Sequence, residues 1–133
     1  MLPTGALGAR CAKYEPAIVR VNGAIFVGED FGPPGYGEDP AHDSREEHLY
    51  IALDTPLCVV AGDSSGLNSA AQSNVKSMEM TYDLNRIRFQ DGWLGRRAVV
   101  EGTLFHAFSG HHHTRVLIRV EAISVLNGVE NSN

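Results

Sequence analysis

His106, His111, His112 and His113 lie close together in the chain. An imidazole can bind a transition-metal ion or exchange a proton near neutral pH, so the cluster suggests a metal site, a pH-sensitive switch or simply the tip of a hairpin. A purification tag is excluded because strand-like sequence stands on both sides, "RRAVVEGTLF" before the cluster and "TRVLIRVEAI" after it. The choice among these readings depends on the elements that position the imidazoles.

Strand-like runs with β-branched and aromatic residues recur five times along the chain. Gly23 in the middle of the first run indicates a bulge or a sharp bend. Asp83 is a candidate helix N-cap, and we expect one short helix or a turn between the third and fourth strands. This order predicts a mostly β protein with a five-stranded, OB-fold-like Greek-key barrel, and a seven-stranded β-sandwich is the alternative. The predicted strands are residues 16–27, 48–60, 74–82, 96–105 and 114–123.

The length of 133 residues favours a single domain, which we place at residues 11–126. We expect residues 1–10 to form a flexible leader and residues 127–133 a disordered tail. Two polar segments, 28–47 and 61–74, interrupt the strand pattern. The first is rich in Gly, Pro and acidic residues, and we predict a solvated loop rather than a calcium site, because no EF-hand spacing is present.

The alternation of side chains along the strands predicts which residues face the core. On strands four and five, the inward set includes Leu104, His106, Val116 and Ile118. Both inward sets share one face if a three-residue loop, Ser109 to His111, joins the strands. The predicted core residues are Val19, Val21, Ile51, Leu53, Val100, Leu104, Val116, Ile118 and Val120.

The same alternation predicts that His106 and His112 point inward and that His113 points outward beside Arg115. Two imidazoles form an incomplete metal site, since zinc sites use three or four protein ligands. Further ligands would have to come from His42, His48 or an acidic loop residue, whose positions the strand pattern does not define. We therefore expect no native metal or other cofactor, with His106 and His112 as the ligands of the alternative metal-binding hypothesis.

Four stretches of the chain resemble a family of small exported bacterial proteins of unknown function. These stretches are "CAKYEP", "FGPPGY", "LDTPLCVV" and "GTLFHAFSGHHHTRVLI". The resemblance extends from Cys11 to about Val120, and its most specific part is the Gly-Thr-Leu-Phe-His-Ala strand followed by the Gly-His-His-His-Thr turn. It implies a signal peptide removed from the mature protein and cysteines at the positions of Cys11 and Cys58, but no reaction.

Cys11 precedes the first predicted strand and Cys58 lies near the end of the second. If these strands are neighbours, the two residues are within bridging distance, and together with the resemblance this predicts a disulfide. Two reduced buried thiols are the alternative. A disulfide would indicate a periplasmic or secreted protein.

The composition excludes several classes of function. The formal net charge is −5 and the basic residues are scattered, which argues against a nucleic-acid partner. No apolar run approaches the ~20 residues of a membrane span. Ser109 and His111 lack a third residue that would orient them as a nucleophile and base, so we do not expect an enzyme.

These exclusions leave a non-catalytic exported binding module as the leading hypothesis. We expect it to recognise a protein partner, as inhibitor or immunity-type proteins do, through its long loops and the histidine-rich hairpin. The residues predicted to contact the partner are Tyr36, His111, His113 and Arg115. The alternative is a periplasmic metal-binding protein that uses the Gly-His-His-His cluster, and an unrecognised enzyme and an oligonucleotide-binding domain rank below it.

Overall fold

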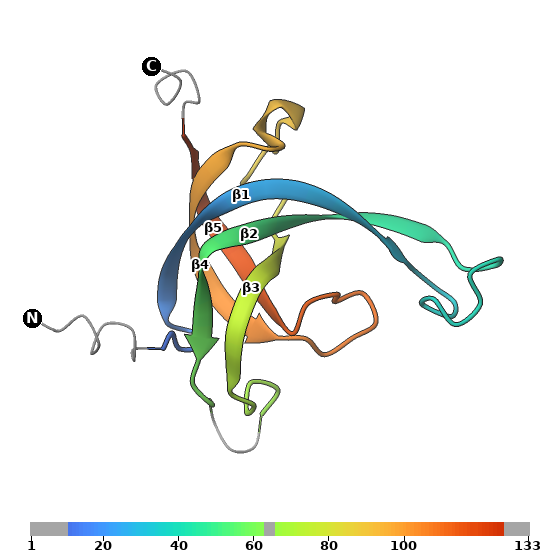
Figure 1. The fold of residues 1–133 in the computed structure, drawn as a ribbon, viewed down its shortest axis with the longest axis horizontal. Helices are drawn as coiled ribbons and strands as arrows, with labels where there is room; N and C mark the ends of the chain where they lie inside the picture. Colours follow the sequence, from blue (N-terminus) through green and yellow to red (C-terminus); the bar gives the residue numbers. More distant parts are fainter. Residues whose placement is uncertain (1–10, 63–65, 127–133) are drawn as a thin grey trace, which may run out of the picture.

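The computed structural model describes residues 11–62 and 66–126, and the predicted leader and tail lie outside these residues. Each of the five predicted strands is present, with different ends (Figure 1). The predicted mostly β fold class is therefore confirmed. The strands are β1 (Ile18–Phe31), β2 (Arg45–Val59), β3 (Gln72–Thr81), β4 (Arg97–His106) and β5 (Val116–Val125).

The five strands form one mixed sheet whose hydrogen-bonded pairs close into a ring, in the order β1-β2-β3-β5-β4. The pairs β1–β2, β2–β3, β1–β4 and β4–β5 are antiparallel, and β3–β5 is parallel. Gly23 is needed where β1 crosses from β4 to β2, because a Cβ atom there would collide with the carbonyl oxygen of Ala52. The bend predicted at this glycine thus corresponds to a close approach of two backbones.

The predicted inward residues form one core. Seven of the nine are buried, and Val19 and Leu53 pack against them while partly buried. In the β4–β5 pair, Leu104 lies opposite Ile118, so the two strands do direct the same parity inward. The core therefore follows from the alternation of side chains along each strand.

The predicted helix between the third and fourth strands is wrong. Within the described chain, the segment holds only a short 3-10 turn, η1 (Asp91–Trp93), and its flanking residues Gln90 and Leu94 are extended. The Asp83 carboxylate accepts a hydrogen bond from the Asn85 amide and so caps a turn rather than a helix. The apolar residues Ile87 and Phe89 pack against the core with the two-residue spacing of an extended chain, which leaves no helical face to bury.

Strands β1 and β2 continue beyond their predicted ends and form a projecting arm, which we define as residues 26–50 (Figure 1). The prediction that residues 28–47 form a loop is wrong at both ends, since only residues 32–44 lie between the strands. Cross-strand contacts stabilise the extension. The Arg45 guanidinium pairs with the Glu29 carboxylate at 2.8 Å and lies 4.6 Å from the centre of the Phe31 ring.

The loop at the end of the arm is held together by Asp43, which is buried rather than solvated. Its carboxylate accepts hydrogen bonds from the backbone amides of Gly35, Gly37 and Asp39, at 2.6, 2.7 and 3.1 Å. Burial raises the pKa of Asp43, but these three amide donors outweigh it and lower the pKa below its usual value.

The predicted disulfide is confirmed. Cys11 and Cys58 are bonded, with their Cα atoms 4.7 Å apart, and Ala12 pairs in parallel with Val59 beside them. The bond fastens the segment before β1 to the end of β2. Within the described part of the chain, helices of the length and hydrophobicity that a membrane span requires are absent.

Candidate metal centre

One face of the arm carries most of the polar side chains of the candidate site. In the β1–β2 register, Gly28 lies opposite His48 and Asp30 lies opposite Glu46. Because side chains alternate along a strand, these residues and Tyr50 point to the same face. Gly28 has no side chain there, and a Cβ atom at this position would collide with the Tyr50 ring. The Tyr50 hydroxyl can thus reach Asp30, to which it donates a short hydrogen bond.

The segment between β4 and β5 brings a second histidine to this face. It spans residues 107–115, so the predicted three-residue loop is wrong. The His113 amide donates a hydrogen bond to the Glu79 carboxylate at 2.9 Å, and the Glu79 amide donates to the Thr114 hydroxyl at 3.0 Å. These two bonds to β3 turn the segment away from the β4–β5 ladder, which is why strand alternation does not apply to His113. Its side chain is only 15% exposed, so the predicted outward orientation is also wrong.

Asp30, His48 and His113 converge from β1, β2 and the β4–β5 segment. Each offers one ligand atom, and these atoms all lie within 4.8 Å of one another. His48 Nδ1 is 3.4 Å from Asp30 Oδ2, and His113 Nδ1 is 4.0 Å from Asp30 Oδ1. The two imidazole rings are tilted, with centroids 4.6 Å apart. The other ring nitrogen, His113 Nε2, is buried and has no hydrogen-bond partner among the described residues, which is unusual for a buried polar atom.

Two further carboxylates surround His48. Its Nε2 atom is 3.6 Å from Glu46 Oε1 and 3.8 Å from Glu79 Oε2, and the Glu79 side chain is only 4% exposed. Among the described residues, neither Lys nor Arg pairs with Asp30, Glu46 or Glu79. Half-buried carboxylates are costly unless a cation or hydrogen bonds balance them. The arrangement of these carboxylates around the two imidazole rings is therefore suited to a bound cation.

Tyr50 keeps its proton in this environment. Burial raises its pKa first, and the hydrogen bond to Asp30 and the negative charges of Asp30 and Glu79 raise it further. Tyr50 therefore remains a neutral donor that fixes the orientation of the Asp30 carboxylate. Hydrogen bonds of this kind hold metal ligands in place in many metalloproteins.

The structure does not bring His106 and His112 together as a ligand pair. The His106 ring contacts the Gln72 side-chain amide and the Ala107 carbonyl, each at 3.0 Å, so both of its nitrogens have partners. The His112 ring packs edge-on against Phe108, with centroids 4.5 Å apart, and its Nδ1 accepts a hydrogen bond from the Phe108 amide. Burial lowers the pKa of His112, which favours the neutral ring that this contact requires.

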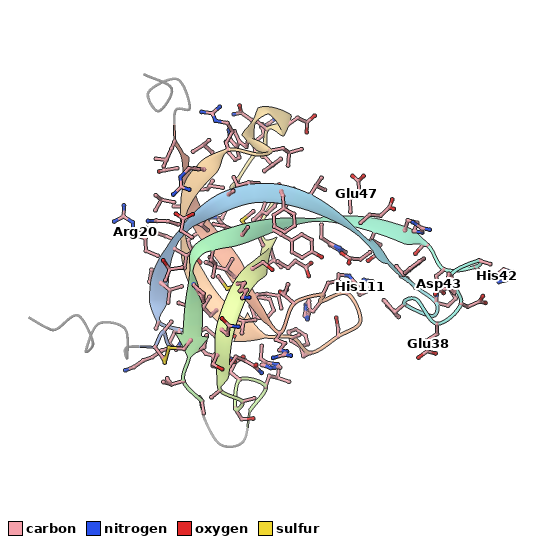
Figure 2. All side chains as sticks on the ribbon, in the orientation of Figure 1. Arg20, Glu38, His42, Asp43, Glu47 and His111 are labelled. Atoms are coloured by element: carbon pink, nitrogen blue, oxygen red, sulfur yellow. A yellow bond between two sulfur atoms is a disulfide. The ribbon has the colours of Figure 1, made fainter. Side chains whose placement is uncertain are left out.

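Two of the predicted partner-binding residues do meet at the surface. The Tyr36 hydroxyl lies 3.2 Å from His111 Nε2, and the rings are in edge contact at 5.4 Å. His111 Nδ1 also lies 3.4 Å from Glu46 Oε1, and Glu46 in turn lies beside His48. Figure 2 shows His111 between the arm and the segment that follows β4. Arg115 is exposed and lies elsewhere, where it donates a weak hydrogen bond to Gln72.

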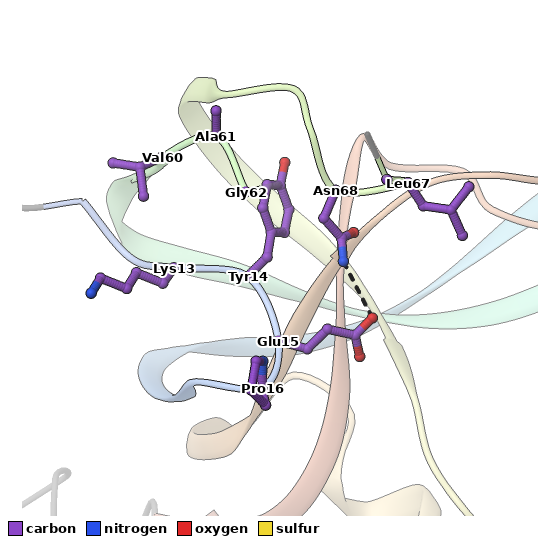
Figure 3. Close-up of a pocket in the computed structure, with 10 residues that line it drawn as sticks. Lys13, Tyr14, Glu15, Pro16, Val60, Ala61, Gly62, Leu67 and Asn68 are labelled. Carbon is purple, nitrogen blue, oxygen red and sulfur yellow. Dashed lines mark hydrogen bonds between the residues drawn. The ribbon is translucent and has the colours of Figure 1, made fainter. Parts of the chain in front are cut away.

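A separate pocket of about 340 Å³ lies near the disulfide, between the segment before β1 and the segment after β2 (Figure 3). Glu15 lines it and is already engaged by Asn68, at 3.3 Å, and by Arg119. The Tyr14 hydroxyl donates to the Ala70 carbonyl at 2.7 Å. The Glu15 carboxylate is thus already paired with Asn68 and Arg119. Among the described residues, the pocket therefore offers no group of ligand atoms comparable to Asp30, His48 and His113.

Asp30 and Glu79 were not identified from the sequence as individual ligands, and His48 was only one of several options. Glu46, His48 and Tyr50 stand at alternate positions, a pattern that indicates one polar face of a strand. That pattern was the available signal. It was obscured because the acidic composition of residues 28–47 suggested a loop.

Neither a curated protein nor a solved structure matches the chain. One family model matches part of the chain. The matched residues begin directly after β3 and extend almost to the end of β5, so they include His113 but not Asp30, His48 or Glu79. The resemblance to a family without an assigned function is confirmed for this part of the chain: residues 82–124 match the domain of unknown function DUF4431.

Proposed function

We propose that the protein is an exported, non-catalytic binding protein that holds one transition-metal ion between Asp30, His48 and His113. The observation that carries this proposal is the convergence of the three ligand atoms within 4.8 Å of one another. Two imidazole nitrogens and one carboxylate oxygen are a donor set used for zinc, copper, nickel and non-haem iron, whereas calcium and magnesium prefer oxygen ligands alone.

The distances between the candidate ligand atoms are close to those of a zinc site. Ligand atoms around a tetrahedral zinc ion lie ~3.4 Å apart, given metal–ligand distances of about 2.0–2.1 Å. His48 Nδ1 and Asp30 Oδ2 already have this separation, at 3.4 Å, and His113 Nδ1 is 4.0 Å from the other Asp30 oxygen. The three ligand atoms lie within 4.8 Å of one another, so binding requires the widest pair to close by up to about 1.4 Å. The buried Glu79 carboxylate, which receives the His113 amide, then holds the backbone of that ligand in place.

The fold that positions the site is proposed to be an OB-fold-like Greek-key barrel. The strand order β1-β2-β3-β5-β4, with β1 also paired to β4, supports this assignment because it is the order of that fold. In this arrangement the arm is an extension of β1 and β2 beyond the barrel. The ligands then come from the arm and from the β4–β5 segment that folds against it.

The Cys11–Cys58 disulfide supports the proposal that the protein acts outside the cytoplasm, in the periplasm or as a secreted protein. Disulfides persist in oxidising compartments and are rare where thiols are kept reduced. Both Cys11 and Cys58 are then used in the disulfide. Imidazole and carboxylate groups are therefore the side chains that remain to bind a metal ion. The donor set of the cluster agrees with this expectation.

Recognition of a protein partner, of the inhibitor or immunity type, is the second candidate function. The observation that favours it is the contact between Tyr36 and His111, which joins the arm loop to the β4–β5 segment at the surface. Tyrosine is enriched where proteins bind one another. His113 is not available for such a contact because its side chain is mostly buried.

Cobalt(II) absorption tests the metal proposal directly. Untagged protein stripped with EDTA should develop visible d–d bands that saturate at one cobalt ion per chain. His113→Ala should abolish the bands, whereas His106→Ala should leave them unchanged because both nitrogens of that ring have protein partners. Bands that survive His113→Ala and disappear in His106→Ala would contradict the assignment of the ligands.

A further inference from the structure

Strand β3 pairs with its two neighbouring strands over different lengths. On the β2 side it is paired from Gln72, which lies opposite Val59, to Glu79, which lies opposite Tyr50. On the β5 side the pairing covers only Glu79–Thr81. Across the described chain, the first seven residues of β3 therefore have no ladder partner on that side, although the sheet is a ring.

A groove of about 510 Å³ lies along this unpaired edge. It is lined on one side by residues 72–77 and on the other by residues 113–116. Both are runs of consecutive residues. Because side chains alternate between the faces of a strand, a groove over one face would be lined by every second residue. The groove thus follows two backbone edges and gives access to backbone amide and carbonyl groups.

The groove is basic in an acidic protein. Its charged lining side chains are Lys76 and Arg115, and no acidic residue lines it, although the chain has 16 acidic and 11 basic residues. Both side chains are exposed. Val75, which is partly exposed, adds apolar surface, and Ser73 and Ser77 line the β3 side.

We propose that this edge binds an extended acidic segment of a protein partner, which adds to the sheet as a further strand beside β3. Strand addition obtains affinity from main-chain hydrogen bonds and specificity from alternate side chains. Asn74, with φ 55°, interrupts the extended backbone of this edge. Its regular part, from Val75 to Met78, can pair with a segment about 13 Å long, at a rise of ~3.3 Å per residue. Lys76 and Arg115 select acidic side chains and favour their approach by charge. The lysine also discourages pairing with a second copy of the same edge.

The proposed strand addition does not depend on the proposed metal site. The experiment uses EDTA-stripped protein, so that a failure of one proposal can be distinguished from a failure of the other. The probe is a library of acetylated, amidated heptapeptides with Glu fixed at every second position, compared with the same library carrying Lys. We expect binders from the Glu library. The tightest binder is then resynthesised in two forms, N-methylated at odd or at even positions. One form should lose binding, because only one set of amides faces β3, and the other should retain it.

Charge variants complete the test. Combining Lys76→Gln with Arg115→Gln should weaken the tightest binder by about tenfold, the effect of losing two exposed ion pairs. Arg20→Gln, on an exposed arginine outside the groove, is the matched control and should have no effect. Equal binding of the two libraries, or a tightest binder unaffected by either N-methylation, would overturn the proposal.

Discussion

His48 and His113 lie with their ring centroids 4.6 Å apart, although one belongs to β2 and the other to the segment between β4 and β5. The contact exists because Glu79 on β3 receives the His113 amide and because His48 projects from the face of the arm that also carries Asp30. Three strands and one loop segment thus meet at a group of imidazoles and carboxylates. The predictions below test that arrangement and the fold that supports it.

Replacing Glu79 with Ala should release the segment that carries His113. The His113 amide loses a hydrogen bond to a buried carboxylate, and such bonds are worth about 1.5–3 kcal/mol. Hydrogen exchange at the His113 amide should therefore accelerate by about tenfold or more. Glu121→Ala, on an exposed residue of β5, is the control. Unchanged protection of the His113 amide in Glu79→Ala would show that this bond does not hold the segment.

The disulfide should stabilise the protein by restricting the unfolded chain. Changing both Cys11 and Cys58 to Ser should lower the free energy of unfolding by about 4 kcal/mol, the loop-closure entropy expected for their separation of 47 residues. Urea denaturation measures this loss. Thiol titration of unfolded, unreduced protein should find no free thiol, and detection of two thiols per chain would contradict the crosslink.

The burial of Ile118 on β5 can be tested against an exposed isoleucine on β1. Ile118 is fully buried in the core, so Ile118→Ala should cost about 2–5 kcal/mol. Ile18 is 63% exposed at the start of β1, and Ile18→Ala should cost less than about 0.5 kcal/mol. Similar losses for the two variants, measured by chemical denaturation, would contradict the assignment of inward and outward positions.

The lowered pKa of His112 predicts a loss of stability in weak acid. The folded protein resists protonation of this ring, whereas the unfolded chain accepts a proton at the ordinary value of about 6.5. The contribution of His112 to stability is therefore complete above pH ~6.5 and is lost as the pH falls toward the lowered pKa of the folded state. NMR titration of the ring should give a midpoint below 6.5. A midpoint above the ordinary value would reverse the sign of the effect.

The positions of the strands along the chain and the core residues could be predicted from the sequence because both depend on local patterns. Alternation of side chains placed Val100, Leu104 and Ile118 in the core, and the structure agrees. The positions of Cys11 and Cys58 beside two predicted strands led to the disulfide that the structure contains. In each case, the residues lie on or beside regular elements, where the direction of a side chain follows from its position.

The candidate site could not be predicted in the same way because it depends on contacts between distant segments. His113 lies outside the strands, and its direction is determined by Glu79 on β3 rather than by alternation. Asp30 lies in a part of β1 whose acidic, glycine-rich composition is typical of a loop. The short distance between Asp30 and His48 follows from the β1–β2 register, which local sequence does not define.

Calorimetric titration of untagged, EDTA-stripped protein with zinc tests the metal site most directly. We expect one zinc ion per chain, and a melting temperature that rises with zinc concentration because the ion binds the folded state. His48→Ala should remove both effects. His42→Ala should retain both, since His42 is exposed and pairs with Asp39 at the end of the arm (Figure 2). Absence of stoichiometric zinc binding in the unmodified protein, or binding that survives His48→Ala, would contradict the site formed by Asp30, His48 and His113.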